Sequence, residues 1–569
     1  MRNILTYIVS AVCFVSCITN DLPYPLIEPS IVSMEIEDAQ QVDIDHENRT
    51  VTAYFPETKD LASVKITNVS YDHEDVISSV PLMGVHDLNT PLKFDIRLYY
   101  DFSWNLVAVR NIDRNVVVSG QLGTSVIDSE NCRVFLKVGK KINPARVDIT
   151  ALKLGPAGLT HYVIYDPATG DKLFEGGDEF VEALKKMDMS EALDVYVTAF
   201  GVTAKWSIYL EVSDVSVEIQ RVSPWTFDAY VVAIGEVGTA SQFRYREKGT
   251  EQWTDVETSD IVADGGMYTA HIKGLRAQTD YEVYAISGTD ETPVTEFVTS
   301  SAKPLPNSSF EYTSLVTGKD YYKFYDPSCG VNDGSYMFWG SGNGEGPDGI
   351  NGSANMGIVI TTVDTKDKVD GRQSVCAQTS EMVGILAAGN LFTGQFYGLV
   401  GTEGGMVNFG RPWTTRPKAL KVHLKYATDK INIISKMPVG VTLTGQDYDR
   451  AQIKVALGNW NYKTYGGTQE CPVHINTTKP STFVDFAKDA STIAYGDLIV
   501  YNDGYLLNNT EKVTSSTGEW HEFTIPLVYN DTFTVPTHII ISCAASQYGD
   551  YFTGCSTSKL WLDAFELVY

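Results

Sequence analysis

The end of the chain, residues 536–569, most restricts how it can fold. It holds two strand-like runs separated by a loop rich in Gly, Ser, Tyr and Asp, residues that favour turns. The first run, residues 538–543, is apolar almost throughout, which predicts a strand buried on both faces. The second run, residues 560–569, alternates between two sets of side chains: Leu560, Leu562 and Ala564 on one side, and Trp561, Asp563 and Phe565 on the other. Because a buried carboxylate needs a partner, we expect Asp563 to have one.

Three motifs in the second half of the chain occur in the order found in one known family. They are Gly-Asn-Leu-Phe-Thr-Gly from Gly389, Arg-Pro-Trp-Thr-Thr-Arg-Pro from Arg411, and Ser-Gln-Tyr-Gly-Asp-Tyr-Phe-Thr-Gly from Ser546, which continues into Ser-Lys-Leu-Trp-Leu-Asp-Ala-Phe-Glu-Leu. Together they resemble the putative carbohydrate metabolism domain of Bacteroidetes lipoproteins. The resemblance implies a domain that handles carbohydrate, and it establishes no reaction.

The chain is strongly acidic, with 44 Lys and Arg residues against 71 Asp and Glu residues and a net charge of 44 − 71 = −27. An acidic surface keeps a secreted protein soluble and disfavours nucleic acid and anionic membrane faces, so we expect no nucleic-acid partner. The 32 tyrosines and 9 tryptophans suit the cores of β-sandwiches and equally suit surfaces that stack on sugars.

The first residues read as a targeting signal. Arg2 precedes an apolar stretch at residues 4–15 that is too short to span a bilayer as a helix. Phe-Val-Ser-Cys at residues 14–17 resembles a bacterial lipobox, which implies removal of residues 1–16 and a lipid on Cys17. The alternative is an ordinary secretory signal with a free Cys17. Residues 17–30 hold three prolines and predict an extended tether. The expected location is therefore the outer membrane, lipid-anchored and exposed at the cell surface.

Six further cysteines remain, and none has metal-site spacing such as Cys-x-x-Cys. Cys543 and Cys555 flank the glycine-rich loop, so they are candidates for a disulfide. The favoured alternative is that all six are small buried apolar residues. They are Cys132, Cys329, Cys376, Cys471, Cys543 and Cys555.

Residues 31–112 and 113–212 are predicted to be two copies of one immunoglobulin-like sandwich. The runs at residues 64–69, 94–98 and 104–106 of the first copy match those at 147–152, 193–197 and 206–208 of the second in residue types and order. Each run has the alternation typical of half-buried strands. Residues 179–189 of the second copy have apolar residues at helical intervals, which predicts a short helix.

Residues 213–300 resemble a fibronectin type III module, through Trp225, Trp253 and the Thr-Asp-Tyr-Glu-Val-Tyr run from Thr279. A proline-rich linker at residues 301–307 follows, and residues 308–569 form the C-terminal domain. The predicted fold class is thus all-β, with tandem sandwiches followed by a jelly roll.

The opening of the C-terminal domain suggests a bound ion. Asn-Ser-Ser-Phe-Glu, ending at Glu311, resembles the start of carbohydrate-binding jelly rolls with a galactose-binding-like fold. That resemblance implies that the first and last strands lie side by side and that Glu311 and Asp563 share a structural calcium ion. Two neighbouring carboxylates repel each other, and a hard cation would relieve the repulsion. The alternative is that each carboxylate faces solvent or accepts backbone hydrogen bonds.

Several residues of this domain are suited to sugar binding, because sugars pack C–H faces on aromatic rings and offer hydroxyls to carboxylate, amide and Arg partners. The candidates are Trp339, Glu345, Asp348, Arg411, Trp413, Arg416, Trp460, Tyr462, Tyr465 and Tyr551, with Tyr548 and Phe552 nearby. Tryptophans in the core, arginines that tie down a loop and a mobile loop around Asp348 are the alternatives.

No catalytic residue can be named from the sequence. A glycosidase usually needs two carboxylates about 5–9 Å apart, and the available ones lie in no recognisable motif. They are Glu345, Asp348, Asp364, Glu403, Asp447 and Asp449. We therefore expect a surface lipoprotein that captures glycans together with outer-membrane uptake proteins. The alternatives are a glycoside hydrolase or polysaccharide lyase, and a structural or adhesive surface protein.

Overall fold

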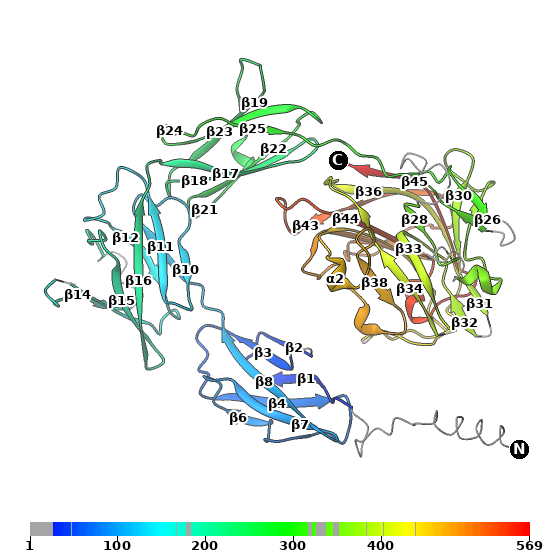
Figure 1. The fold of residues 1–569 in the computed structure, drawn as a ribbon, viewed down its shortest axis with the longest axis horizontal. Coiled ribbons are helices and arrows are strands. Elements are labelled where there is room, and N and C mark those ends of the chain that lie inside the picture. Colours follow the sequence, from blue (N-terminus) through cyan, green and yellow to red (C-terminus); the bar gives the residue numbers. More distant parts are fainter. Residues whose placement is uncertain are drawn as a thin grey trace, which may run out of the picture. The chain divides into compact units, whose positions relative to one another are not determined.

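The computed structural model describes residues 27–569 except 47, 167, 178–183, 317–320, 326–336, 345–351, 383, 402 and 439. The predicted signal, Cys17, most of the tether, Glu345 and Asp348 lie outside the described residues. The chain divides into two compact units, one up to Ser216 and one from Val217 to Tyr569, except that Gly235–Thr239 and Asp264–Met267 group with the first. As predicted, the described residues form almost entirely β-structure (Figure 1). None of the helices they form is long and apolar enough to cross a membrane.

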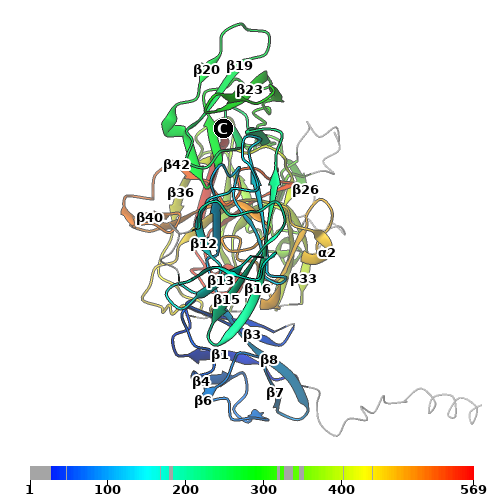
Figure 2. The ribbon, with the colours of Figure 1, turned by 90° about the vertical axis from the view of Figure 1, so that its left-hand side faces the viewer.

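The first unit holds two sandwiches, each built from one smaller and one larger sheet (Figure 2). In the first sandwich the sheets are β1(Ile31–Ile36)-β4(Val64–Tyr71)-β6(Gly84–His86) and β2(Gln41–Asp45)-β3(Thr50–Phe55)-β8(Asp101–Arg110)-β7(Leu92–Arg97)-β5(Ile77–Ser78). In the second they are β9(Asn115–Val118)-β12(Ile149–Lys153) and β10(Val126–Asp128)-β11(Arg133–Val138)-β16(Val202–Val212)-β15(Leu193–Ala199)-β13(His161–Tyr165)-β14(Lys172–Gly176).

The two sandwiches repeat the same strand pairing, which is the arrangement expected of two copies of one unit. In the first, β8 pairs in parallel with β3 and antiparallel with β7; in the second, β16 pairs in parallel with β11 and antiparallel with β15. Trp104 of β8 and Trp206 of β16 take equivalent buried places. The predicted helix at 179–189 lies partly outside the described residues, and residues 184–189 are not helical because Val147 forms a bridge with Met187 there.

The third module is a sandwich of two sheets. They are β17(Val217–Pro224)-β18(Ala229–Gly235)-β22(Met267–Ile272)-β21(Ile261–Asp264) and β20(Thr254–Asp255)-β19(Ser241–Glu247)-β23(Asp280–Ser287)-β24(Asp290–Glu291), with β25(Thr295–Val298) on β23 and a 3-10 turn at Thr258–Asp260. Tyr281 is buried, and its hydroxyl accepts the backbone N–H of Arg276 at 3.0 Å. This Tyr-to-backbone bond is typical of Greek-key sandwiches.

The C-terminal domain is a sandwich of one large and one smaller sheet (Figure 1). The large sheet is β38(Val473–Asn476)-β34(Gly404–Phe409)-β33(Asn390–Val400)-β44(His538–Ala544)-β37(Ala451–Gly458)-β39(Thr492–Tyr501)-β40(Gly504–Leu507)-β41(Val513–Thr514), extended by β28(Trp339–Gly340), β35(Arg411–Pro412) and β43(Val528–Tyr529). The smaller sheet is β29(Thr361–Asp364)-β30(Ser374–Gln378)-β45(Lys559–Val568)-β36(Ala419–Ala427)-β42(His521–Pro526). Short elements are β26(Ser314–Val316), β27(Tyr321–Lys323), β31(Ser380–Met382), β32(Ile385–Ala387), α2(Tyr462–Tyr465) and 3-10 turns at Ser353–Met356, Pro480–Thr482 and Gly549–Tyr551.

The predicted strands at the end of the chain are β44 and β45, and a bulge changes the predicted alternation of β45. Leu560 and Leu562 enter the core as expected. The register then shifts by one residue and Ala564 takes a positive φ of 47°, so Phe565 points to the core in place of Ala564. The prediction that Phe565 faces the opposite side was therefore wrong, because strict period-2 alternation cannot anticipate a bulge.

The third module and the C-terminal domain are joined through Arg416. This side chain is 5% exposed and donates to Ser223 Oγ at 2.7 Å, to Pro224 O at 2.7 Å and to Thr532 O at 3.2 Å. Trp225 packs on Tyr529 with ring centroids 4.5 Å apart. The guanidinium therefore serves this junction, which confirms the alternative that Arg416 ties down a loop rather than binding sugar.

Substitution of Arg416 tests this junction. We expect Arg416→Ala to lower the free energy of unfolding by about 3 kcal/mol, because buried carbonyls lose a charged donor. Arg276→Ala, which removes a side chain that is 67% exposed in the third module, should change it by less than about 0.5 kcal/mol. Denaturant unfolding of the two variants measures the difference, and equal stability would contradict the assignment.

Candidate functional site

A groove of about 360 Å³ runs along the face of the large sheet that is turned away from the core. Its floor carries Gln452 and Lys454 from β37 and Ser542 from β44. The residues that alternate with Gln452 and Lys454 along the strand are Ile453 and Val455, and these point into the core. The alternation of β37 thus places an apolar row between the sheets and a polar row in the groove.

Aromatic rings form the walls of the groove. Phe483 and Tyr551 meet edge to face, with centroids 5.2 Å apart and planes at 88°. Tyr548 lies beneath the guanidinium of Arg450, whose central carbon is 5.2 Å from the ring centroid. Phe483, Tyr548 and Tyr551 are all half-buried, so each keeps part of its ring accessible. Such partly exposed rings beside polar groups are suited to a ligand with both apolar faces and hydroxyls.

Several polar groups of the groove have unused hydrogen-bonding capacity. Lys454 makes no ion pair or side-chain hydrogen bond with the described residues, although its charge acts on Asp497 and Asp550. The buried Oε1 of Gln547 has no hydrogen-bond partner among the residues that the structure describes. Asp550 also lines the groove, as does the exposed Asp485. Although Asp550 is exposed to solvent, the protein atoms that crowd its carboxyl raise its pKa, while the charge of Lys454 acts in the opposite direction.

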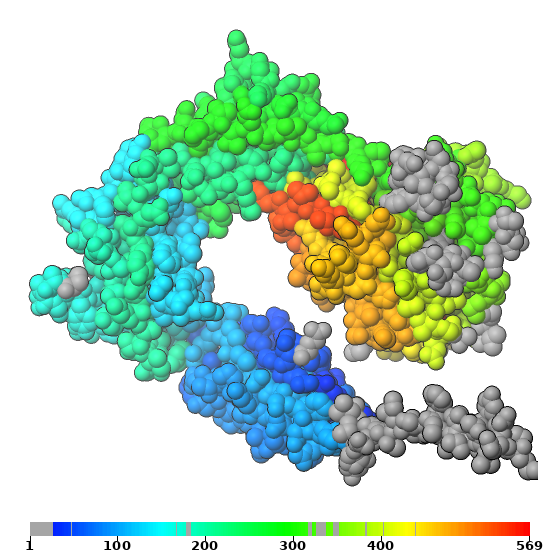
Figure 3. Space-filling view, viewed as in Figure 1, coloured from blue at the N-terminus to red at the C-terminus, as the bar shows by residue number. Residues whose placement is uncertain are grey.

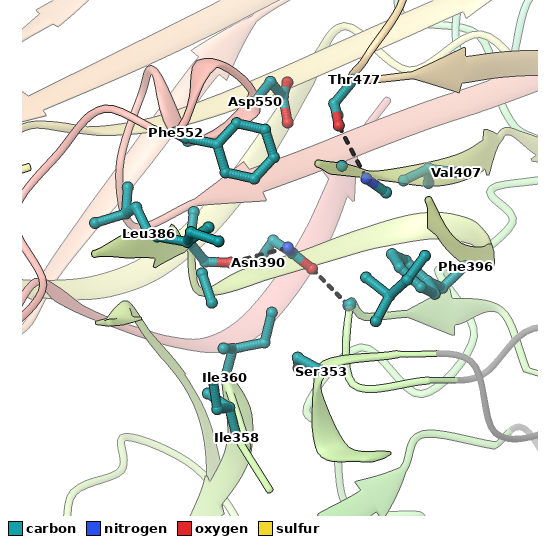
Figure 4. A pocket seen from close by; sticks show the side chains of 18 of the residues that line it. Ser353, Ile358, Ile360, Leu386, Asn390, Phe396, Val407, Thr477, Asp550 and Phe552 are labelled. Carbon is teal, nitrogen blue, oxygen red and sulfur yellow. Dashed lines mark hydrogen bonds between the residues drawn. The ribbon is translucent and has the colours of Figure 1, made fainter. Parts of the chain in front are cut away.

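A second, smaller cavity of about 150 Å³ is lined in part by Gly549, Asp550 and Phe552 (Figure 4). Its walls are mostly apolar, with Ile360, Leu386 and Phe552 among them. Asn390 is fully occupied, since it accepts from Gly342 N at 2.8 Å and donates to Ala388 O at 3.0 Å. Asp550 therefore stands where a polar groove meets an apolar pocket.

The three predicted tryptophans do not form a sugar platform. Trp339, Trp413 and Trp460 are 0%, 1% and 2% exposed. Trp339 donates to Pro306 O at 2.9 Å, and Trp460 donates to Asp489 at 3.1 Å. A ring without an exposed face cannot stack on a sugar, so these predictions were wrong and the core alternative holds.

Arg411 is likewise structural. It is 3% exposed and donates to Gly394 O at 2.9 Å, to Phe338 O at 3.3 Å and to Met337 O. Its guanidinium thus satisfies backbone carbonyls of the strands around β28 and β33. The predicted role in binding sugar is corrected for the same reason as that of Arg416.

The predicted tyrosines separate into different places. Tyr462 begins the single helical turn α2, which Asn461 caps, and it is 40% exposed. The hydroxyl of Tyr465 is held by Asp489 at 2.8 Å and Ser491 at 2.9 Å. Of the predicted sugar-binding residues that the structure describes, Tyr551 lies in the groove, together with its predicted neighbour Tyr548.

Three of the four predicted carboxylates that the structure describes have structural partners. Asp449 is 2% exposed and accepts from Ser546 Oγ, Ser558 Oγ and Cys555 N within 2.9 Å. Asp447 caps its own turn at Thr444, and Asp364 accepts from Trp561 Nε1 at 3.1 Å. The sequence did not lead to four groove residues, which are Gln452, Lys454, Asp485 and Gln547. For Gln452 and Lys454 on β37, the alternation of side chains in residues 451–458 could have indicated a shared outer face.

The cysteines follow the favoured alternative where they are described. Cys376, Cys471, Cys543 and Cys555 are buried free thiols, and Cys132 is a half-buried free thiol. Cys543 and Cys555 therefore form no disulfide in this structure. Cys329 lies outside the described residues.

Glu311 and Asp563 clamp one loop from two sides. Glu311 accepts from Arg372 N at 2.8 Å and Arg372 Nε at 2.9 Å, while Asp563 accepts from Val369 N at 2.8 Å and Asp370 N at 3.0 Å. The opening segment does lie beside β45, since Phe565 N donates to Ser308 O at 2.9 Å.

These two carboxylates fit a loop clamp better than a cation site. Each of their four oxygens accepts an N–H group, counting Ala564 N on the second oxygen of Asp563, and N–H donors oppose a cation. Burial raises the pKa of Asp563 despite these bonds. Among the residues the structure describes, no group of three or more His, Cys, Asp or Glu is placed to hold a metal ion. The calcium site stays a prediction.

The C-terminal domain is similar to one known protein family. Residues 309–568 match the family model described as "Putative carbohydrate metabolism domain". This confirms the resemblance seen in the sequence and marks the domain as carbohydrate-related. No curated protein matches the chain.

Solved structures with related folds cover much of the chain at low similarity. A putative glycoside hydrolase from Bacteroides thetaiotaomicron has 15% identity and a TM-score of 0.27, with 81% of this chain and 96% of that chain covered. Another from Bacteroides vulgatus has 18% identity, a TM-score of 0.29 and coverages of 47% and 97%. The surface glycan-binding protein PbSGBP-B from Prevotella bryantii has 8% identity, a TM-score of 0.18 and coverages of 80% and 99%. At these scores the likenesses carry no conclusion about function.

A chelator should change the melting temperature if Glu311 and Asp563 hold calcium, and should not change it if they only clamp the loop. We expect EDTA to leave the melting temperature unchanged. Asp563→Ala should instead lower the free energy of unfolding by about 2 kcal/mol, because three backbone N–H groups lose their acceptor. Glu566→Ala, on the same strand but 63% exposed, is the matched control with little effect. A melting temperature that falls on chelation and returns with calcium would support the ion instead.

Proposed function

We propose that the C-terminal domain binds a glycan in the groove formed by Phe483, Tyr551 and the polar residues of β37. The main support is the combination of partly exposed rings with polar groups, in a domain whose family model is carbohydrate-related. Among these polar groups, the Oε1 of Gln547 has no hydrogen-bond partner among the described residues, whereas Gln452 donates to Asp497 at 3.0 Å and would bond a sugar through its remaining capacity. A sugar ring would pack a C–H face on Tyr551, while Gln452, Lys454 and Gln547 would bond its hydroxyls.

The proposed biological role is capture of oligo- or polysaccharide at the cell surface. The lipobox-like sequence at residues 14–17 supports a lipid on Cys17 and an outer-membrane location. Capture of this kind would supply outer-membrane proteins that import glycans. The net charge of −27 favours this role over nucleic-acid binding.

Glycoside hydrolysis is a second candidate, favoured by the position of Asp550. Its raised pKa suits a general acid, and Asp485 lines the same groove. Hydrolysis would require these two carboxyl groups to flank one glycosidic bond. Binding without turnover is the first proposal because it needs only the rings and polar groups described above.

Tyr551→Ala tests the glycan groove. We expect it to weaken binding about tenfold, or about 1.4 kcal/mol, because the sugar loses its stacking surface. Tyr462→Ala removes a tyrosine that is 40% exposed outside the groove, and it should leave affinity unchanged. Calorimetry of the full chain with plant, fungal and host oligosaccharides measures both variants.

The same samples distinguish binding from hydrolysis. Saturable heat without new reducing ends supports capture, whereas reducing ends that disappear in Asp550→Asn support the hydrolase. Equal affinity of the two tyrosine variants would contradict the groove as the binding site. If no glycan binds, the structural or adhesive alternative is favoured.

The lipid anchor has its own test. Cys17→Ser should move the protein from the membrane fraction to the soluble fraction of cells that make it, because the thiol that accepts the lipid is lost. Cys132→Ser, a change at a thiol distant in sequence, should leave it in the membrane fraction. Fractionation followed by immunoblotting gives the answer.

A further inference from the structure

A second groove, of about 730 Å³, lies in the first unit where its two sandwiches meet. The end of β8 and the connection that follows it form one side, with Arg110, Ile112 and Arg114. The other side is the tip of the β15–β16 hairpin, with Phe200 and Trp206 among its lining residues. The space-filling view shows the first sandwich, in blue, in contact with the second, in cyan (Figure 3).

Contacts within the unit fix the two sides of this groove. Lys153 of the second sandwich pairs with Glu57 of the first at 3.0 Å. The Ala157 N–H also points to Glu57, at 3.4 Å from Oε1. The two arginines are therefore held in a shared wall rather than on independent modules.

Both arginines are positioned by one nitrogen and by an aromatic ring. Arg110 donates through Nε to Lys59 O at 2.7 Å, and its guanidinium carbon lies 4.1 Å from the Phe200 ring centroid. Arg114 donates through Nε to Leu154 O at 2.8 Å, and its guanidinium carbon lies 5.4 Å from the Trp206 ring centroid. Stacking and a single anchoring bond orient each guanidinium while leaving its terminal nitrogens for other partners.

The terminal nitrogens of these arginines are poorly satisfied by the described residues. Arg110 Nη2 is buried without a partner, and neither of its terminal nitrogens makes an ion pair. Arg114 Nη1 has only a 3.5 Å contact with Ser129 Oγ. Burial lowers the pKa of both side chains, although the charge of Asp60 acts in the opposite direction on Arg110, and that of Glu57 does so on Arg114. An anion in the groove would add a charge-assisted partner for the guanidinium groups.

Phe200 occupies its place at a conformational cost. It stands at the hairpin tip with φ of 49°, next to Gly201 with φ of 75°. Hairpin tips with these angles usually take Asn or Gly, because a bulky side chain is disfavoured at positive φ. The phenylalanine keeps an accessible ring, 36% exposed, beside Arg110.

We propose that this groove binds an acidic sugar, with its carboxylate or sulfate group on the guanidinium groups of Arg110 and Arg114. The sugar ring would lie against Phe200, and its hydroxyls would meet Asn89 and the carboxylate of Asp60, which also line the groove. A groove of this size with apolar and hydroxyl-binding groups fits an acidic saccharide better than a small inorganic anion. The site is separate from the groove of the C-terminal domain, so either proposal can fail alone.

Binding of charged and neutral forms of one saccharide tests the site. The full chain carrying Cys17→Ser, which prevents lipid attachment, is titrated with trigalacturonate, with its fully methyl-esterified form and with a sulfated heparin disaccharide. We expect at least one of the two anionic probes to bind, more weakly as salt is raised, and the neutral ester not to bind. Uronate or sulfate preference then identifies the acidic group.

Variants locate the binding. Arg110→Gln and Arg114→Gln should each weaken binding of the anionic probe at least tenfold, and Arg110→Lys should recover only part of the loss because it cannot donate in a fork. Arg97→Gln makes the same charge change at an exposed pair with Asp101 in the first sandwich and should have no effect. Tyr551→Ala should also have no effect.

The proposal is overturned if the ester binds as well as the acid, if neither anionic probe binds, or if the arginine variants bind normally. Melting curves accompany each variant. Should Arg110→Gln fail to fold, Arg114→Gln carries the same decision, because Arg114 anchors through a different carbonyl.

Discussion

Burial of aromatic rings between two sheets is the constraint on which the C-terminal domain depends. Phe310, Trp339 and Phe565 form a triangle with every pair of centroids 5.4 Å apart and every pair edge to face. They come from the opening segment, from β28 and from β45, so one cluster joins parts of the chain more than 200 residues apart in sequence. This geometry favours ring edges against ring faces and fixes the spacing of the sheets.

Core and groove are two faces of the same strands. In β37, Ile453 and Val455 enter the core while Gln452 and Lys454 face the groove. An aromatic residue in such a domain is therefore either structural or available to a ligand, and its exposed fraction decides which. Tyr551 keeps an accessible ring, whereas Trp413 does not. The aromatic content that suggested sugar binding is mainly the content of the core.

The sequence predicted the fold more accurately than the candidate ligand site. Period-2 patterns located the two similar sandwiches, with Trp104 and Trp206 in equivalent strands. This was possible because the burial of a strand follows the local alternation of apolar and polar residues. Three features escaped this reasoning. The bulge at Ala564 moved Phe565 into the core, Trp460 turned inward to pack on Phe486, and Asp563 found its donors in a loop nearly 200 residues earlier. Each depends on contacts between distant segments, which alternation and residue type do not encode.

Arginine shows how satisfaction of donors separates structural from ligand-binding roles. Arg110, Arg411 and Arg416 have the same side chain but different partners. Arg411 and Arg416 direct their terminal nitrogens to backbone carbonyls and a hydroxyl. Arg110 uses Nε alone and leaves its terminal nitrogens without protein acceptors. A partly buried cation in that state costs free energy that an anion can recover, whereas a saturated guanidinium gains nothing from one. The same reasoning favours Lys454 and Gln547 over the buried tryptophans in the C-terminal domain, because unused hydrogen-bonding capacity, rather than residue type, is what a ligand can exploit.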